Sequence, residues 1–315
     1  MIDVVILFFL LGLVAGLLKS NLRLPSAVYD LLSALLLLAI GLKGGQELAS
    51  QHFSVLLPQI VAVAMMGFLL PLLVFPILLK IGKFRRVDAA SIAAHYGSVS
   101  VGTFAVVVSF LEARQVFFEE HMSLFVVILE IPAIIVGIVL ARGLDRSMNW
   151  KKFAHEVFLG KSIVFLVGGL IIGCLAGQKG LESIGPLFFN PFKGILALFL
   201  MEMGLVVASQ FASLKKYGTF LLVFGIVTPL FFSLIGIYLG FLLGLSIGGV
   251  TVLGTLAASA SYIAVPAAMR TSVPSSNPTL SLTASLGVTF PFNVVLGIPI
   301  YYFLAEKLKL ILEGF

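Results

Sequence analysis

Long apolar stretches separated by short polar segments run through the whole chain. Most of them approach the roughly 20 residues that a helix needs to cross a hydrocarbon core about 30 Å thick. The pattern therefore predicts an all-α integral membrane protein with about ten transmembrane helices. The ten predicted spans cover residues 2–18, 27–42, 54–80, 88–111, 122–142, 159–176, 192–213, 217–245, 248–269 and 279–305.

Two of these spans are interrupted by small residues and hydroxyls. The fourth contains Gly97-Ser98-Val99-Ser100-Val101-Gly102-Thr103, and the ninth contains Ala257-Ala258-Ser259-Ala260-Ser261-Tyr262-Ile263-Ala264-Val265-Pro266. Such residues weaken a membrane helix and let its backbone open. Interrupted helices at matching places in two repeats are typical of a transporter whose substrate site lies at mid-membrane. Close helix packing through small residues is the alternative interpretation.

The two halves of the chain resemble each other. Residues 1–142 and 159–315 contain five predicted spans each, and residues 143–158 link them. Ile40-Gly41-Leu42 in the second span corresponds to Met203-Gly204-Leu205 in the seventh. Ile131-Pro132 and Phe290-Pro291 correspond in the fifth and tenth spans, at nearly the same spacing. An odd number of spans in each half makes the repeats inverted, unless the matches are chance similarity among apolar segments.

Charge indicates an orientation in the membrane. The chain is 60% hydrophobic and only 11% charged, against about 25% charged in soluble domains. With the N-terminus outside, fourteen of the twenty cations lie in inner loops, which favours both termini outside and the 143–158 linker inside. The six outer cations would be Lys43, Arg114, Lys179, Lys193, Lys307 and Lys309. The linker could be an amphipathic surface helix or a plain connector.

An opened membrane helix exposes N–H groups at one new end and carbonyl groups at the other. The N–H end suits an anion, and the carbonyl end with nearby hydroxyls suits Na⁺. The predicted anion-binding residues are Gly97, Ser98, Val99, Ser100, Thr103, Ser259, Ala260, Ser261 and Tyr262. The predicted residues for Na⁺ and coupling are Ser98, Thr103, Glu130, Ser261 and Asn293.

Polar residues inside the membrane are costly and are therefore functional candidates. Glu130 lies just before Pro132, which removes a backbone donor, and could bind Na⁺, hold a proton or make a structural hydrogen bond. Asn293 follows Pro291 and could coordinate Na⁺ through its carbonyl oxygen. Four further residues have two open interpretations, a functional role or a packing, anchoring or capping role. They are Asp88, His95, Glu202 and Arg270.

The sequence contains few motifs for enzymatic, nucleotide-binding or metal chemistry. It contains no H-E-x-x-H, no P-loop and no Cys/His cluster, and its one cysteine, Cys174, excludes an intramolecular disulfide. We therefore expect a transporter and not an enzyme, with Na⁺ as coupling ion and no other cofactor. The net charge of +6 reports orientation and does not indicate a nucleic-acid partner.

Four motifs resemble those of a known family. Gly41-Leu42-Lys43-Gly44-Gly45 is similar to G-L-x-G-G, and Gly97 to Thr103 is similar to G-A-V-S-x-S-T. Glu130-Ile131-Pro132-Ala133 is similar to D-I-P-A, and Arg270-Thr271-Ser272-Val273-Pro274-Ser275-Ser276-Asn277-Pro278 to R-A-G-I-P-S-A-N-P. These are motifs of the cyanobacterial sodium-dependent bicarbonate transporters, the SbtA family, and the resemblance covers nearly all ten spans.

This resemblance implies an inverted five-plus-five fold with broken helices crossing at spans four and nine, and a homotrimer. It also implies Na⁺-driven bicarbonate uptake and a PII-like regulator on the inner side. The chain departs from the family at Tyr262, which takes an acidic position of the A-S-S-S-D-I-S-G-P motif, and in its shorter linker. A related small anion therefore stands beside bicarbonate as substrate.

We expect a secondary transporter in the plasma membrane that moves a small monovalent anion inward with Na⁺. Core spans three to five and eight to ten would move against a gate of spans one, two, six and seven. The alternatives are a cation/proton exchanger, a non-transporting membrane sensor, and a membrane enzyme with Ser98 or Ser261 as nucleophile.

Overall fold

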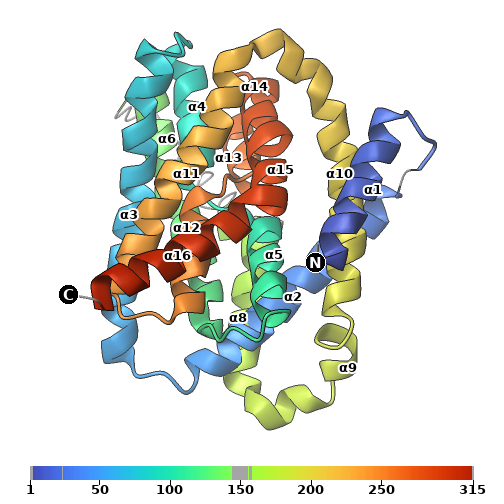
Figure 1. The fold of residues 1–315 in the computed structure, drawn as a ribbon, viewed down its shortest axis with the longest axis vertical. Coiled ribbons are helices and arrows are strands. Elements are labelled where there is room, and N and C mark those ends of the chain that lie inside the picture. The colour runs from blue at the N-terminus through green and yellow to red at the C-terminus, as the bar shows by residue number, and fades with distance from the viewer. Residues whose placement is uncertain (1–2, 23, 144–154, 156–157, 314–315) are drawn as a thin grey trace.

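The computed structural model describes residues 3–22, 24–143, 155 and 158–313, and every regular element in these ranges is helical (Figure 1). Eight helical stretches of this part of the chain are long and apolar enough to cross a membrane. They are Ser26–Leu48, Phe53–Lys80, Arg86–Glu112, Glu120–Arg142, Lys161–Glu182, Gly185–Lys215, Thr219–Leu242 and Pro278–Leu312. The predicted all-helical membrane fold class is confirmed at this level.

The helices of the first half follow the predicted spans closely. They are α1 (Val4–Leu17), α2 (Ser26–Leu48), α3 (Phe53–Lys80), α4 (Arg86–Gly97), α5 (Val101–Glu112), a 3-10 turn at Glu120–Met122 and α6 (Ser123–Arg142). The first predicted span is shorter than expected, because α1 has only 14 residues. The fourth span is divided between α4 and α5.

The second half contains more separate helical elements than the first. Its helices are α8 (Lys161–Glu182), α9 (Gly185–Phe188), α10 (Phe192–Tyr217), α11 (Thr219–Leu242), α12 (Ile247–Ala258), α13 (Ala264–Ser272), α14 (Pro278–Leu282), α15 (Phe290–Phe292) and α16 (Ile298–Glu313). The ninth predicted span is divided between α12 and α13. The tenth runs from α14 to α16 through π-helical turns at Thr283–Thr289 and Asn293–Gly297. Most of the 143–158 linker, with its expected surface helix, lies outside the described residues.

Four helices pair across the two halves. Helix α1 packs along α10, at the right of Figure 1, and α2 packs along α8. The first helix of the first half thus meets the second long helix of the other half, and the second meets the first. The other spans, built from α3 to α6 and α11 to α16, pack mainly with one another.

Small residues four apart allow both pairs to approach closely. On the α2–α8 contact, a Cβ atom on Gly41 would lie 2.6 Å from the Leu166 carbonyl oxygen, and one on Gly173 would overlap the Leu42 carbonyl oxygen. Gly45 and Gly169 lie in the same contact. The α1–α10 contact uses Gly12, Gly16, Gly204 and Ala208. Lipid tails are as apolar as leucine, so such backbone-to-backbone packing holds membrane helices together.

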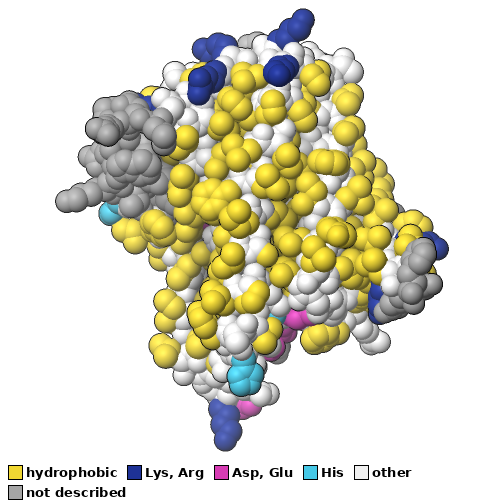
Figure 2. Space-filling view, turned by 90° about the vertical axis from the view of Figure 1, so that its left-hand side faces the viewer, with side chains coloured by type: hydrophobic (Ala, Val, Ile, Leu, Met, Phe, Trp, Pro, Cys, Tyr) yellow, Lys and Arg dark blue, Asp and Glu magenta, His cyan; other side chains and the backbone are white. Residues whose placement is uncertain are grey.

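The molecular surface has the distribution that a bilayer requires. Figure 2 shows a broad hydrophobic band on the face covered by α3, α11 and α16, with Lys and Arg side chains gathered at the upper end. The band includes exposed side chains such as Phe68, Leu69, Val227 and Phe231. By contrast, α4 and α12 are almost wholly buried. The interrupted spans are therefore shielded from lipid by the unbroken ones.

We predict that Gly173→Ala destabilises the protein, whereas Gly168→Ala does not. The first substitution forces the α2 and α8 backbones apart, and overpacking of this kind typically costs about 1–3 kcal/mol. Gly168 lies on the same helix and has nothing within 4 Å of the position of a Cβ atom. Thermal unfolding of both purified variants in detergent measures the difference, and equal midpoints would contradict the close α2–α8 contact.

Candidate functional site

The two interrupted spans open as the sequence predicts. Helix α4 ends at Gly97, and Ser98 and Ser100 adopt extended backbone conformations before α5 begins. Helix α12 ends at Ala258, and the chain from Ser259 to Ile263 leads into α13. Ser98, Ser100, Ser259 and Ser261 are all at most 2% exposed. Both openings therefore lie deep inside the protein, away from lipid.

The two openings are hydrogen bonded to each other. The backbone N–H of Ser100 donates to the Ser259 hydroxyl at 3.0 Å. The backbone N–H of Ser261 donates to the His95 carbonyl oxygen at 2.8 Å. Each break thus supplies an acceptor to the other, which meets part of the requirement that backbone polar groups at membrane depth find partners within the protein. We call this region, residues 97–103 and 258–265, the crossing.

Serine hydroxyls accept hydrogen bonds from the first turns of the helices that leave the crossing. The Ser100 hydroxyl accepts hydrogen bonds from the Thr103 backbone N–H at 3.0 Å and from the Thr103 hydroxyl at 2.9 Å. The Ser261 hydroxyl accepts from the Val265 backbone N–H at 3.3 Å. Helices α5 and α13 therefore both begin at the crossing, and a helix N-terminus carries partial positive charge.

One buried hydroxyl group at the crossing, that of Ser98, has no hydrogen-bond partner among the described residues. The buried Tyr262 hydroxyl lies beside the Ser100 side chain and the Gly102 backbone. The Tyr262 ring packs edge-on against Phe290, and its hydroxyl oxygen occupies the place that a Cβ atom on Gly102 would need. Buried polar atoms are nearly always paired in native proteins, so the unpaired Ser98 hydroxyl calls for an explanation. A polar ligand at the crossing provides one.

The other residues of the crossing are small or contribute only backbone groups. A Cβ atom on Gly97 would lie 2.5 Å from the Pro71 ring, so only glycine ends α4 there without a shift. Val99 and Ala260 are buried and contribute backbone groups to the openings. A cavity of about 10 Å³ separates the crossing from α2 and α10, and Ser33, Gly102 and Phe199 line it. That space is close to the minimum for one water molecule.

Glu130 lies apart from these contacts. It is 3% exposed on α6, and its carboxylate has no hydrogen bond or ion pair with any described residue. Pro132, one half-turn later, packs against Gly67 of α3. An unpaired carboxylate at this depth is costly, which retains Glu130 as a candidate for a cation or a proton. No hydrogen bond joins it to the crossing.

Asn293, by contrast, is tied to the crossing. Its side-chain N–H donates to the carbonyl oxygen of Ala258, the last residue of α12, at 2.9 Å. Its side-chain oxygen accepts a hydrogen bond from the Tyr301 hydroxyl at 2.6 Å. An amide oxygen has two lone pairs, so one remains available to a further partner. The residue thus holds the C-terminal end of α12 in place.

Sequence reasoning missed the pair Tyr96 and Thr289. The Thr289 hydroxyl donates to the Gly225 carbonyl oxygen at 2.8 Å, so the Tyr96 hydroxyl donates to Thr289 at 2.6 Å. This bond joins α4 to the tenth span. Thr289 lies two residues before Pro291, as Glu130 lies two residues before Pro132, and this spacing could have identified it.

The ends of the two interrupted spans are anchored reciprocally. Asp88, in the first turn of α4, accepts from the Asn277 backbone N–H at 2.8 Å. Glu119 accepts from the Ser246 backbone N–H, just before α12, at 2.7 Å. The segment that precedes the last span of each half therefore holds the start of the interrupted span of the other half.

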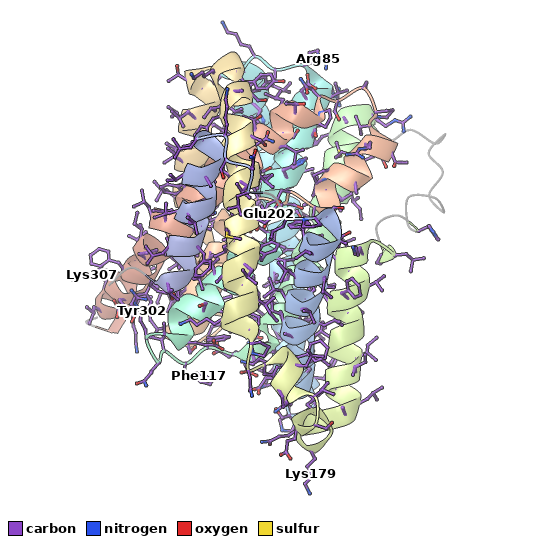
Figure 3. All side chains as sticks on the ribbon, turned by 90° about the vertical axis from the view of Figure 1, so that its right-hand side faces the viewer. Arg85, Phe117, Lys179, Glu202, Tyr302 and Lys307 are labelled. Carbon is purple, nitrogen blue, oxygen red and sulfur yellow. The ribbon has the colours of Figure 1, made fainter. Side chains whose placement is uncertain are left out.

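Three further candidates have structural partners. Asp88 also pairs with Arg85 at 2.7 Å, and this hydrogen bond raises the pKa of the exposed Arg85. Glu202, which Figure 3 places midway along α10, accepts from the Leu24 backbone N–H at 3.4 Å. His95 is buried, and its Nδ1 atom lies 2.7 Å from the Ser91 carbonyl oxygen. Among the described residues, no group of three or more His, Cys, Asp or Glu side chains could hold a metal ion.

Comparison with known proteins identifies one matching family. The family model described as the Na⁺-dependent bicarbonate transporter superfamily matches residues 4–306. None of the curated proteins compared with the chain matches it.

We predict that Ser259→Ala destabilises the protein and Ser109→Ala does not. The first change leaves the buried Ser100 N–H without an acceptor, at a cost of about 1–3 kcal/mol. The hydroxyl of Ser109 is equally buried but has no partner among the described residues, so its loss breaks no bond. Thermal unfolding in detergent compares them, and an unchanged Ser259→Ala midpoint would argue against the hydrogen bond between the breaks.

Proposed function

The chain belongs to the Na⁺-dependent bicarbonate transporter superfamily, and on that basis we propose that it carries bicarbonate, or a related small anion, into the cell together with Na⁺. The observation that carries the proposal is the crossing. Two helices, α5 and α13, begin there beside the buried Ser98 hydroxyl, which has no partner among the described residues. A channel-free, buried site of this kind suits alternating access by a secondary transporter.

The anion binds at the start of α5 and α13 in this proposal. Backbone N–H groups and the positive ends of the two helix dipoles attract its negative charge. The hydroxyl of Ser98 is free to donate to its oxygens, and the hydroxyl of Tyr262 lies beside Ser100 and Gly102 at the same place. Tyr262 is neutral where the resembling family has a carboxylate, so it adds a donor and removes a repulsive charge. Ser100, Thr103, Ser259 and Ser261 shape the remainder of the site.

Na⁺ binds on the carbonyl side of the crossing, where α4 and α12 end. Oxygen ligands suit this hard cation; Ser98 directly follows α4, and the side chain of Asn293 is bonded to the last residue of α12. Thr103 and Ser261, at the starts of α5 and α13, complete the ligand set that we propose from the sequence. We assign one negatively charged side chain to the coupling of Na⁺ with transport, the unpaired carboxylate of Glu130. A bound cation would pair with it through a rearranged α6 or through water.

Inverted repeats underlie the transport movement that we propose. The exchanged pairing of α1 and α2 with α10 and α8 is what a pseudo-two-fold axis in the membrane plane produces. The reciprocal anchors at Asp88 and Glu119 support the same relation. Both α3 and α11 contain an internal proline, Pro71 and Pro229. Helices α1, α2, α8 and α10 then form the gate, and α3 to α6 with α11 to α16 form the moving core.

The ends of the molecule favour one orientation. The end that includes the connection from α3 to α4 is rich in Lys and Arg and faces the cytoplasm in our proposal (Figure 2). Both termini then lie outside in our proposal. The homotrimer and the PII-like regulator remain predictions from the family resemblance, and most of the linker that bears on the regulator is outside the described residues.

We predict Na⁺-gradient-dependent uptake of labelled bicarbonate by proteoliposomes containing the purified protein. Ser98→Ala lowers this uptake by roughly tenfold or more, because a hydrogen bond to a charged group contributes about 1.5–3 kcal/mol. It leaves the unfolding midpoint unchanged, because the Ser98 hydroxyl has no partner among the described residues. Absence of gradient-dependent uptake by the unaltered protein would refute bicarbonate transport.

We predict that Glu130→Gln raises the Na⁺ concentration needed for half-maximal uptake by about tenfold or more, since neutralising a carboxylate removes several kcal/mol of attraction at low dielectric. Glu202→Gln, the control on α10, changes it little. An unaltered Na⁺ dependence removes Glu130 from coupling. Proton-driven Na⁺ flux without bicarbonate, abolished by Glu130→Gln, would instead favour the cation/proton exchanger.

A further inference from the structure

A second cavity, lined by both apolar and polar residues, lies beside the crossing. It is a cavity of about 120 Å³ between α4, α13 and the segment that leads into α14, and we call it the α4–α13 cavity. Its rim is exposed and includes Arg270, Pro274 and Pro278. Buried Ser91 and His95 also line it, so it runs from the surface into the protein. It shares no lining residue with the small cavity between the crossing and α2.

His95 presents an acceptor that nothing in the described structure uses. Its Nδ1 atom lies 2.7 Å from the Ser91 carbonyl oxygen, and a carbonyl oxygen only accepts, so Nδ1 carries a proton. In the neutral ring Nε2 then has a free lone pair. This atom is buried and has no hydrogen-bond partner among the described residues. The side chain therefore favours a ligand that can donate a hydrogen bond.

The charge that lines the α4–α13 cavity is positive. Arg270 at its rim is the one charged residue in the lining. Asp88, one turn before Ser91, is neutralised by Arg85 at 2.7 Å and accepts from Asn277. The Arg85 guanidinium in turn donates to the Ser275 carbonyl oxygen at 3.3 Å. An anion is thus favoured here over a cation.

The volume admits a small oxyanion. One water molecule needs about 10–15 Å³ of such space, so this cavity holds a four-atom anion with some of its water. An anion that also carries an O–H group matches both features, since its oxygens accept from Arg270 and its O–H donates to His95 Nε2. Bicarbonate has this combination, whereas nitrate has the same shape without the proton.

We propose that the α4–α13 cavity is a second binding site for a small protonated oxyanion, namely bicarbonate, distinct from the crossing. The choice of bicarbonate rests on the proposed function. His95 connects the two places, because its side chain lines the cavity and its backbone carbonyl oxygen accepts from Ser261 at 2.8 Å. Bicarbonate that accumulates on the cytoplasmic side thereby reaches a site in direct contact with the transport machinery.

Cysteine protection tests this site without relying on transport. Cys174 is the only cysteine and is exposed, so Cys174→Ser provides a clean background. Ser276→Cys, within the lining, then reports on the cavity by its rate of reaction with a maleimide. The measurement uses purified full-length protein in Na⁺-free buffer, where Na⁺-dependent binding at the crossing is absent.

Bicarbonate is expected to slow the labelling of Ser276→Cys several-fold, and nitrate at the same concentration is not. Arg270→Gln abolishes the protection, while Lys83→Gln, which removes an exposed cation outside the cavity, retains it. His95→Asn keeps a donor for the Ser91 carbonyl but removes Nε2, and so removes the preference for bicarbonate over nitrate. Should His95→Asn fail to fold, the arginine and lysine variants decide the question alone.

Equal labelling rates with and without bicarbonate overturn the proposal, as does protection that persists in Arg270→Gln or that nitrate matches. Ser98→Ala separates the two hypotheses, because it is expected to lose uptake and keep protection. Protection without any uptake by the unaltered protein would count against the proposed function only. Uptake without protection would count against the α4–α13 site only.

Discussion

The need to pair backbone polar groups away from water governs this structure. A helix satisfies its own N–H and C=O groups, and an opened helix inside a membrane does not. The breaks after Gly97 and Ala258 persist because each offers an acceptor to the other, through the Ser259 hydroxyl and the His95 carbonyl oxygen. Neither opening would be stable alone. The same contact therefore stabilises the breaks and forms the candidate site, since it brings their polar groups together.

Unbroken helices make this arrangement possible by taking the lipid contact. The buried interrupted spans carry the polar residues, while α3 and α11 expose large apolar side chains. Glycines such as Gly41 and Gly204 allow α1, α2, α8 and α10 to pack backbone to backbone. In these four helices the glycines contact backbone atoms of the neighbouring helix. At the crossing, by contrast, the glycines contact side chains, the Pro71 ring and the Tyr262 hydroxyl.

The helices and both breaks could be predicted from sequence because each depends on neighbours along the chain. Runs of apolar residues mark spans, and clusters such as Ser98 and Ser100 mark weak points in them. The partner of each polar group could not be predicted in this way. Nothing local indicates that Asn293 holds Ala258, that Tyr96 reaches Thr289, or that Asp88 anchors Asn277. Those pairings depend on how distant helices stack. Glu130 illustrates this limit. Its burial could be predicted from the apolar residues around it, whereas its lack of a partner could not.

The two breaks differ in length, and this difference has an energetic consequence. The first consists of Ser98–Ser100, whereas the second extends from Ser259 to Ile263. Two identical inverted halves would exchange their shapes when the molecule turns from one face of the membrane to the other, and the two end states would be equal in free energy. Unequal breaks remove that degeneracy. Under the alternating-access movement proposed above, the protein would consequently rest with a built-in preference for one face even when no solute or ion gradient acts on it.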